Sequence, residues 1–177
     1  GDLVQLSRED APPPRPEIMD LADVVARAVQ RAKRRGPTMV FDVQTESQLV
    51  LGDSQAIERS VTNLLDNAVK FSPSGGRITV RMADETITVA DEGPGISDED
   101  LPHIFDRFYR SDQSRNTPGT GLGLSIVAHT VNSHGGWIKA SRAPGGGALF
   151  TMHLPTVDPY DVAGNESAGS ESLLTSE

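Results

Sequence analysis

Hydrophobic residues recur at helical spacing in three segments of the chain and at alternating positions between them. Leu21, Val24 and Val25 begin a run that predicts a helix over residues 20–35, with Asp20 as its N-cap and Gly36 at its end. Two further helices are predicted at 54–71, capped by Asp53, and at 122–134. Strand patterns occupy the intervening segments, at 39–44, 48–52, 77–82, 86–91, 136–142 and 148–154.

The two ends of the chain lack this periodicity. Four prolines within residues 11–16 predict a stiff extended linker, and residues 1–10 before it resemble the last turns of a helix. From residue 157 onward there are five acidic residues and no Lys or Arg, so this tail is predicted to be disordered. We therefore expect a helix stub plus linker at 1–17, one domain at 18–155 and a tail at 156–177.

Composition and charge narrow the function classes. The chain has 177 residues, enough for one domain with tails, and no apolar run long enough to span a bilayer. It has no cysteine, which excludes disulfides, thiolate metal sites and cysteine nucleophiles. The formal net charge of -9 argues against nucleic acid as a partner. The polar face of the first helix nevertheless carries a basic cluster, which is either a docking surface or a solvated helix face: Arg27, Arg31, Lys33, Arg34 and Arg35.

Polar residues form a stripe on the second helix, apart from its apolar face. Asn63, Asn67 and Lys70 recur at i, i+4 and i+7. Two amide oxygens one turn apart suit Mg²⁺, and a lysine one turn further suits a phosphate. Taken alone, the same stripe is more typical of a solvated helix face.

Two glycine-rich segments follow. The first segment, Asp91-Glu-Gly93-Pro-Gly95-Ile96, lies at the end of a predicted strand. A carboxylate there can accept a hydrogen bond from an exocyclic amine, and the glycines allow a ligand to approach the backbone closely. Such a segment is also a common turn. Residues 119–125 (Gly-Thr-Gly-Leu-Gly-Leu-Ser) lead into the third helix, whose N-terminal N–H groups suit phosphate. This segment is neither a P-loop nor a dinucleotide fingerprint.

An aromatic and arginine cluster lies between the two glycine segments. Phe105 and Phe108 flank Arg107, and Tyr109 and Arg110 follow. Core aromatics beside surface arginines are the alternative interpretation of this cluster.

In this order, the four segments resemble the ATP-binding domain of two-component sensor histidine kinases, within the gyrase, Hsp90, histidine kinase and MutL ATPase group. Residues 63–70 look like the N box, 91–95 the first glycine box, 105–108 the F box and 119–123 the second glycine box. The resemblance covers about residues 18–155. It implies an α/β (α+β) two-layer sandwich, with a mixed sheet of about five strands, about three helices on one face, and a flexible lid at roughly 106–121.

The resemblance also assigns roles. Asn67 and Asn63 would bind Mg²⁺, Lys70 would contact phosphate, and Arg110 and Arg107 would stabilise the transferred phosphoryl group. Asp91 would accept the adenine amino group. The implied nucleotide-contacting set further comprises Phe71, Gly93, Gly95, Ile96, Gly119, Thr120, Gly121, Leu122, Gly123 and Leu124. Two positions depart from the pattern: Phe71 replaces a common Tyr, and Leu149 replaces a hydroxyl residue, which puts a water-mediated adenine contact in doubt.

Phosphoryl transfer is favoured over ATP hydrolysis. Relatives that hydrolyse ATP carry a Glu four residues before the metal-binding Asn, and Asn63 cannot take a proton. In the family the acceptor His precedes an acidic residue, but no histidine of this chain does: the following residues are Ile104, Thr130, Gly135 and Leu154. We therefore expect the acceptor on a separate helical dimerisation domain, with residues 1–10 as its stub.

The expected partners follow from the same resemblance. They are the His-bearing dimerisation domain and a response regulator, in a homodimeric, membrane-anchored bacterial parent whose cytoplasmic part includes this fragment, itself monomeric. An anti-sigma-type serine kinase of the same fold and a non-catalytic nucleotide-gated interaction module are the alternatives.

Overall fold

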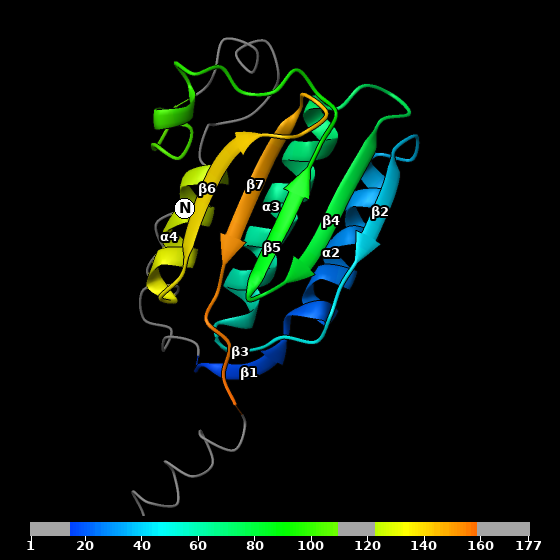
Figure 1. Cartoon of the computed structure of the whole chain (residues 1–177). Coiled ribbons are helices and arrows are strands. Elements are labelled where there is room, and N and C mark those ends of the chain that lie inside the picture. Colours follow the sequence, from blue (N-terminus) through cyan, green and yellow to red (C-terminus); the bar gives the residue numbers. More distant parts are fainter. Residues whose placement is uncertain (1–14, 110–122, 159–177) are drawn as a thin grey trace, which may run out of the picture.

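The computed structural model describes residues 15–109 and 123–158, which form two layers (Figure 1). One layer is a five-stranded sheet, and the other consists of three helices that cover one face of it. The helices are α2 (Leu21–Arg35), α3 (Ser54–Phe71) and α4 (Gly123–Ser133). The predicted α/β sandwich is therefore confirmed, and the helix bounds agree with the predicted ones to within one residue.

The sheet has the strand order β2-β4-β5-β7-β6, in which β2 runs parallel to β4 and the other neighbours are antiparallel. Its strands are β2 (Val40–Gln44), β4 (Arg77–Ala83), β5 (Thr86–Ala90), β6 (Trp137–Arg142) and β7 (Ala148–His153). The sheet is thus mixed, as expected. Both β5 and α3 end at the upper end of the sandwich in Figure 1.

Local sequence explains where the first two helices begin. The Asp20 carboxylate accepts a hydrogen bond from Ala22 N at 3.0 Å, and Asp53 accepts from Gln55 N and Ala56 N at 3.1 and 3.2 Å. Both carboxylates satisfy amide groups that have no partner within the helix. The two predicted N-caps are therefore confirmed.

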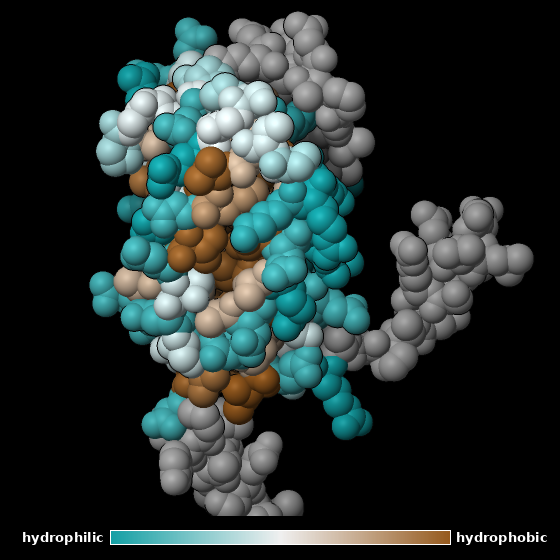
Figure 2. All heavy atoms as spheres, turned by 90° about the vertical axis from the view of Figure 1, so that its right-hand side faces the viewer, coloured by the Kyte–Doolittle hydropathy of each residue, from teal (hydrophilic) through white to brown (hydrophobic). Residues whose placement is uncertain are grey.

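The core lies between the layers. Alternate residues of β4 (Ile78, Val80, Met82) are buried against the helices, and Leu64 and Leu65 of α3 are fully buried beneath them. At the edge strand β2, Phe41 and Val43 are only half-buried. Figure 2 views this side of the molecule and shows apolar side chains between polar flanks.

Several arginines of α2 form ion pairs with α3 of the same chain. Arg27 and Arg31 pair with Glu58 of α3 at 2.6 and 3.5 Å, and Arg35 pairs with Asp66 at 2.6 Å. These pairs are exposed, so each contributes little to stability. They show that three of these arginines bind α3 rather than projecting into solvent alone.

Two features of the fold differ from the sequence-based expectation. Residues Glu17–Asp20, where the linker was expected to run into the first helix, form a strand, β1. It pairs antiparallel with β3 (Leu49–Gly52), so the strand expected at 48–52 lies in a separate two-stranded sheet. The pairing of Ile18 with Leu51 joins residues far apart in the sequence, which local patterns do not reveal.

Several predictions concern residues outside the described ranges. They are the helix stub at 1–10, most of the proline linker, most of the lid, and the tail beyond Asp158. Within the described ranges, no helix is both long enough and apolar enough to cross a membrane.

Candidate nucleotide-binding site

Asp91 is the most buried acidic residue of the candidate site. It follows β5 directly and its exposed fraction is 5%. Its Oδ1 accepts hydrogen bonds from Gly93 N at 2.9 Å and from Ala148 N at 3.1 Å. Burial raises the pKa of this carboxyl, and the two backbone hydrogen bonds lower it in part. Oδ2 makes no hydrogen bond to the described residues, so it is the oxygen available to a ligand.

Close backbone approaches fix the loop after Asp91. A Cβ on Gly93 would lie 2.4 Å from the Phe71 carbonyl oxygen, so only glycine lets this loop touch the end of α3. Gly95 has φ +79°, and a Cβ there would lie 2.8 Å from Gly146 O. The first glycine segment is thus held between the end of α3 and the β6–β7 turn.

The β6–β7 turn adds a contact that sequence patterns missed. A Cβ on Gly147 would lie 2.0 Å from the Asp91 backbone oxygen and 2.7 Å from its Oδ1. The signal available was only a run of glycines at 145–147, which predicts a turn and not a site.

The expectation for Leu149 needs correction. The β7 residue beside Asp91 is Ala148, which is buried and donates to the carboxylate. Leu149 is the next residue on the strand and belongs to the opposite face of the sheet, paired with Ala90. A hydroxyl at 149 would therefore point away from Asp91, and the residue that faces it carries only a methyl group.

The polar stripe on α3 is formed as predicted. Asn63 and Asn67 are half-buried, and neither side-chain amide is hydrogen-bonded to a residue in the described ranges. Their spacing places them on one side of α3, distinct from the buried face of Leu64, Leu65 and Ala68. Lys70 follows on the same side, exposed, with its ammonium 5.3 Å from the centre of the Phe71 ring.

The chemistry of this stripe fits a magnesium ion with retained waters. Amide oxygens are hard ligands, and Mg²⁺ in nucleotide sites takes few protein ligands and several waters. Among the described residues no group of three or more His, Cys, Asp or Glu side chains forms an alternative metal site.

The structure describes only some of the remaining predicted site residues. Ile96 and Leu124 pack against the core, and Gly123 is the first residue of α4 with nothing near its Cβ position. Arg107 is exposed and its guanidinium lies 5.0 Å from the centre of the Phe108 ring, with no ion pair to a described residue. Arg110, Gly119, Thr120, Gly121 and Leu122 lie outside the described residues.

The domain has two layers, a buried carboxylate after a central strand, and the polar stripe of Asn63, Asn67 and Lys70 on the adjacent helix. Together these features define an α/β nucleotide-binding domain. A family described as histidine kinase-, DNA gyrase B- and HSP90-like ATPase matches residues 52–158. The chain belongs to this family of ATP-binding domains.

Several proteins similar to this chain are sensor kinases. The signal transduction histidine-protein kinase/phosphatase MprB of Mycolicibacterium smegmatis is 48% identical over 164 residues, which are 88% of this chain and 33% of that protein. A solved structure of a mycobacterial sensor histidine kinase MprB is 38% identical, with a TM-score of 0.75, covering 79% of this chain and 98% of that one. The ATP-binding domain of PrrB from Mycobacterium tuberculosis is 24% identical with a TM-score of 0.65, covering 82% of this chain and all of that one, a likeness of fold alone. The chain spans about a third of the length of the curated relatives it matches.

Proposed function

We propose that this domain binds Mg-ATP and donates the γ-phosphoryl group to a histidine of a separate helical dimerisation domain in a longer sensor kinase. The observation that carries the proposal is Asp91, whose Oδ1 is held by two backbone amides while Oδ2 is left for a ligand. A carboxylate in this position accepts from the amino group of adenine. Guanine presents a carbonyl oxygen there, which leaves two acceptors facing one another.

Asn63 and Asn67 would hold Mg²⁺, and Lys70 would contact the phosphates. Asn63 is an amide and cannot act as the base that activates water, which favours transfer over hydrolysis. Arg107, Arg110 and the glycine segment at 119–123 would complete the phosphate contacts.

The histidines of the chain support an acceptor elsewhere. His134 is engaged at both ring nitrogens, by Thr130 O at 2.7 Å and Asp53 N at 3.1 Å. His153 contacts Glu85 O at 3.1 Å and stacks on Trp137. His103 pairs with Asp106, and His129 is exposed on α4 without an acidic residue after it.

The parent protein is accordingly a homodimer, anchored in a bacterial membrane, with this domain on the cytoplasmic side and a response regulator as its downstream partner.

Calorimetry with Mg-ATP and Mg-GTP tests the nucleotide site. We expect micromolar affinity for ATP, about -8 kcal/mol, and binding at least ~10-fold weaker for GTP. The Asp91→Asn variant should lose ATP affinity because its amide nitrogen presents a donor to the adenine amino group. Equal affinities for the two nucleotides, or an unchanged Asp91→Asn variant, would contradict the proposal.

Incubation with γ-labelled ATP tests the transfer. Label should appear on the His-bearing helical domain of the parent protein when that domain is added, and not on this chain alone. Labelling of this chain by itself would overturn the assignment of the acceptor.

A further inference from the structure

Glu92 follows Asp91, and its side chain contacts the start of β4. Its Oε1 accepts a hydrogen bond from Arg77 N, the first residue of β4, at 2.5 Å. We propose that Glu92 is a positioning residue: it fixes the backbone that carries Asp91 and so sets both affinity and selectivity for the adenine base. This inference rests on the proposed nucleotide site at Asp91.

The register of the sheet explains why this carboxylate matters. Thr79 of β4 lies opposite Ala90, the last residue of β5. If this antiparallel register continued for two more residues, Arg77 would lie opposite Glu92. The chain turns away after Ala90, and the ladder ends there. The Glu92 carboxylate supplies an acceptor for the Arg77 amide at the point where the strand no longer continues. A charged acceptor makes this hydrogen bond stronger than the neutral ladder bond it extends.

The loop is therefore held from two sides. On the inner side Asp91 Oδ1 binds the amides of Gly93 and Ala148. On the outer side Glu92 ties the same turn to β4. Without the outer bond, the Asp91–Gly93 turn keeps its inner contacts but loses its anchor to the neighbouring strand, and Oδ2 is no longer held in one direction.

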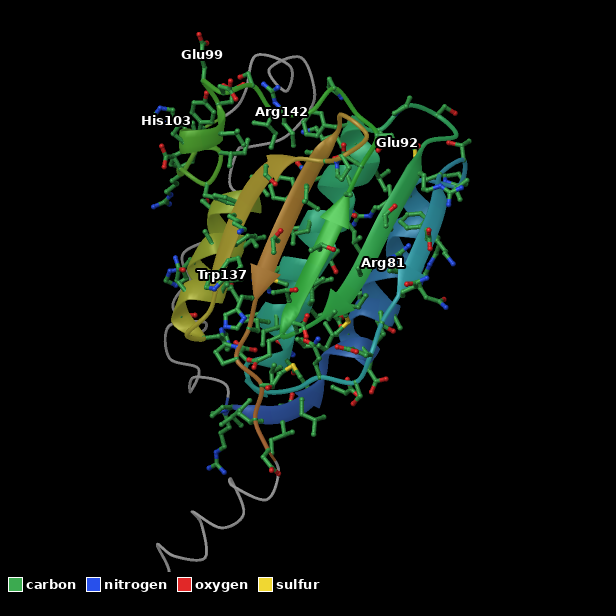
Figure 3. The ribbon with its side chains drawn as sticks, in the orientation of Figure 1. Arg81, Glu92, Glu99, His103, Trp137 and Arg142 are labelled. Carbon is green, nitrogen blue, oxygen red and sulfur yellow. The ribbon has the colours of Figure 1, made fainter. Side chains whose placement is uncertain are left out.

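Glu92 is not one of the residues proposed to contact the nucleotide. It is exposed, and Figure 3 shows it at the upper end of the sheet beside the start of β4. Glu99 offers a matched control, because it is an exposed acidic residue at the same end of the molecule, without a hydrogen bond or ion pair to a described residue, and it projects away from the body in Figure 3.

The test compares Glu92→Ala, Glu92→Gln and Glu99→Ala in the full chain. We expect Glu92→Ala to weaken Mg-ATP binding by about tenfold, which corresponds to ~1.4 kcal/mol, and to reduce the preference for ATP over GTP. Glu92→Gln keeps an acceptor oxygen and should restore both values to within about twofold of wild type. Glu99→Ala should bind as the wild type does. Hydrogen exchange at the Arg77 amide should accelerate in Glu92→Ala alone.

Selectivity and rescue separate positioning from simple loss of stability, which would weaken both nucleotides alike. Wild-type ATP affinity and selectivity in Glu92→Ala would overturn the inference, as would equal losses in Glu92→Ala and Glu92→Gln. Failure of the wild-type chain to bind ATP would instead overturn the proposed function, and the Arg77 exchange rates would still report whether Glu92 anchors the loop.

Discussion

Replacing Gly147 by alanine tests the packing beneath Asp91 with a single methyl group. The added Cβ would lie 2.0 Å from the Asp91 backbone oxygen, 2.6 Å from its carbonyl carbon and 2.7 Å from its Oδ1. All three distances are far below van der Waals contact, and two of the atoms are backbone. Either the β6–β7 turn or the end of β5 must move by about 1 Å.

The magnitude follows from the contacts that this movement breaks. Overpacking a closely packed site costs ~1–3 kcal/mol. The shift also strains the bonds from Asp91 N to Ala148 O at 3.0 Å and from Ala148 N to Asp91 Oδ1 at 3.1 Å, each worth ~0.5–1.5 kcal/mol. We expect a loss of about 2–6 kcal/mol in the free energy of unfolding and a fall in ATP affinity of at least about tenfold.

Urea unfolding and calorimetry measure the two quantities. Gly145→Ala is the control, because it lies in the same turn, has an ordinary φ, and has no atom within 4 Å of its Cβ position. If Gly147→Ala matched Gly145→Ala in both stability and ATP affinity, the described contact between the turn and Asp91 would be wrong.

Three further predictions address the site and its frame. Asn67→Ala should abolish Mg-dependent ATP binding while the unfolding curve stays that of the wild type, since the Asn67 side chain makes no hydrogen bond to a described residue; unchanged affinity in calorimetry would exclude the metal role. Burial raises the pKa of Asp91, so ionisation of this carboxyl opposes folding. The stability that the protonated carboxyl contributes is complete below the pKa of the unfolded state and is lost as pH rises through the pKa of the folded state. Asp91→Asn should therefore gain stability relative to wild type as pH rises above the ordinary carboxyl pKa of 3.8. Wild-type ATP affinity should fall as pH drops through the raised pKa, because a carboxyl protonated at Oδ2 presents a donor to the adenine amino group. A stability difference that does not change with pH would refute this. His134→Ala should lose ~1–3 kcal/mol of stability by removing the partner of Asp53 N and of Thr130 O, and exposed His129→Ala should not; equal urea midpoints for the two variants would contradict the assignment.

Local sequence patterns were sufficient to predict the three helices of the sandwich. The apolar stripe of α3 and its Asp53 cap act within one turn of the chain, so spacing and residue type determine the result. The same holds for Asn63 and Asn67, whose common side of the helix follows from their spacing alone. Asp91 was identified by its place after a strand and before two glycines, within a segment that recurs in a known family.

The frame around Asp91 depends instead on contacts that no local pattern contains. Gly147 and Ala148 come against Asp91 only because β7 pairs with β5, and Arg77 meets Glu92 only because β4 pairs with β5 on its other side. Each of these partners is an ordinary residue of a turn or strand in the sequence. The carboxylate that we propose contacts the nucleotide is therefore recognisable in the sequence, whereas the residues that hold it are recognisable only once the order of the strands is known. Substitutions at Glu92 and Gly147 accordingly probe the strand order and the nucleotide site together, while substitutions at Asn63 and Asn67 probe the site alone.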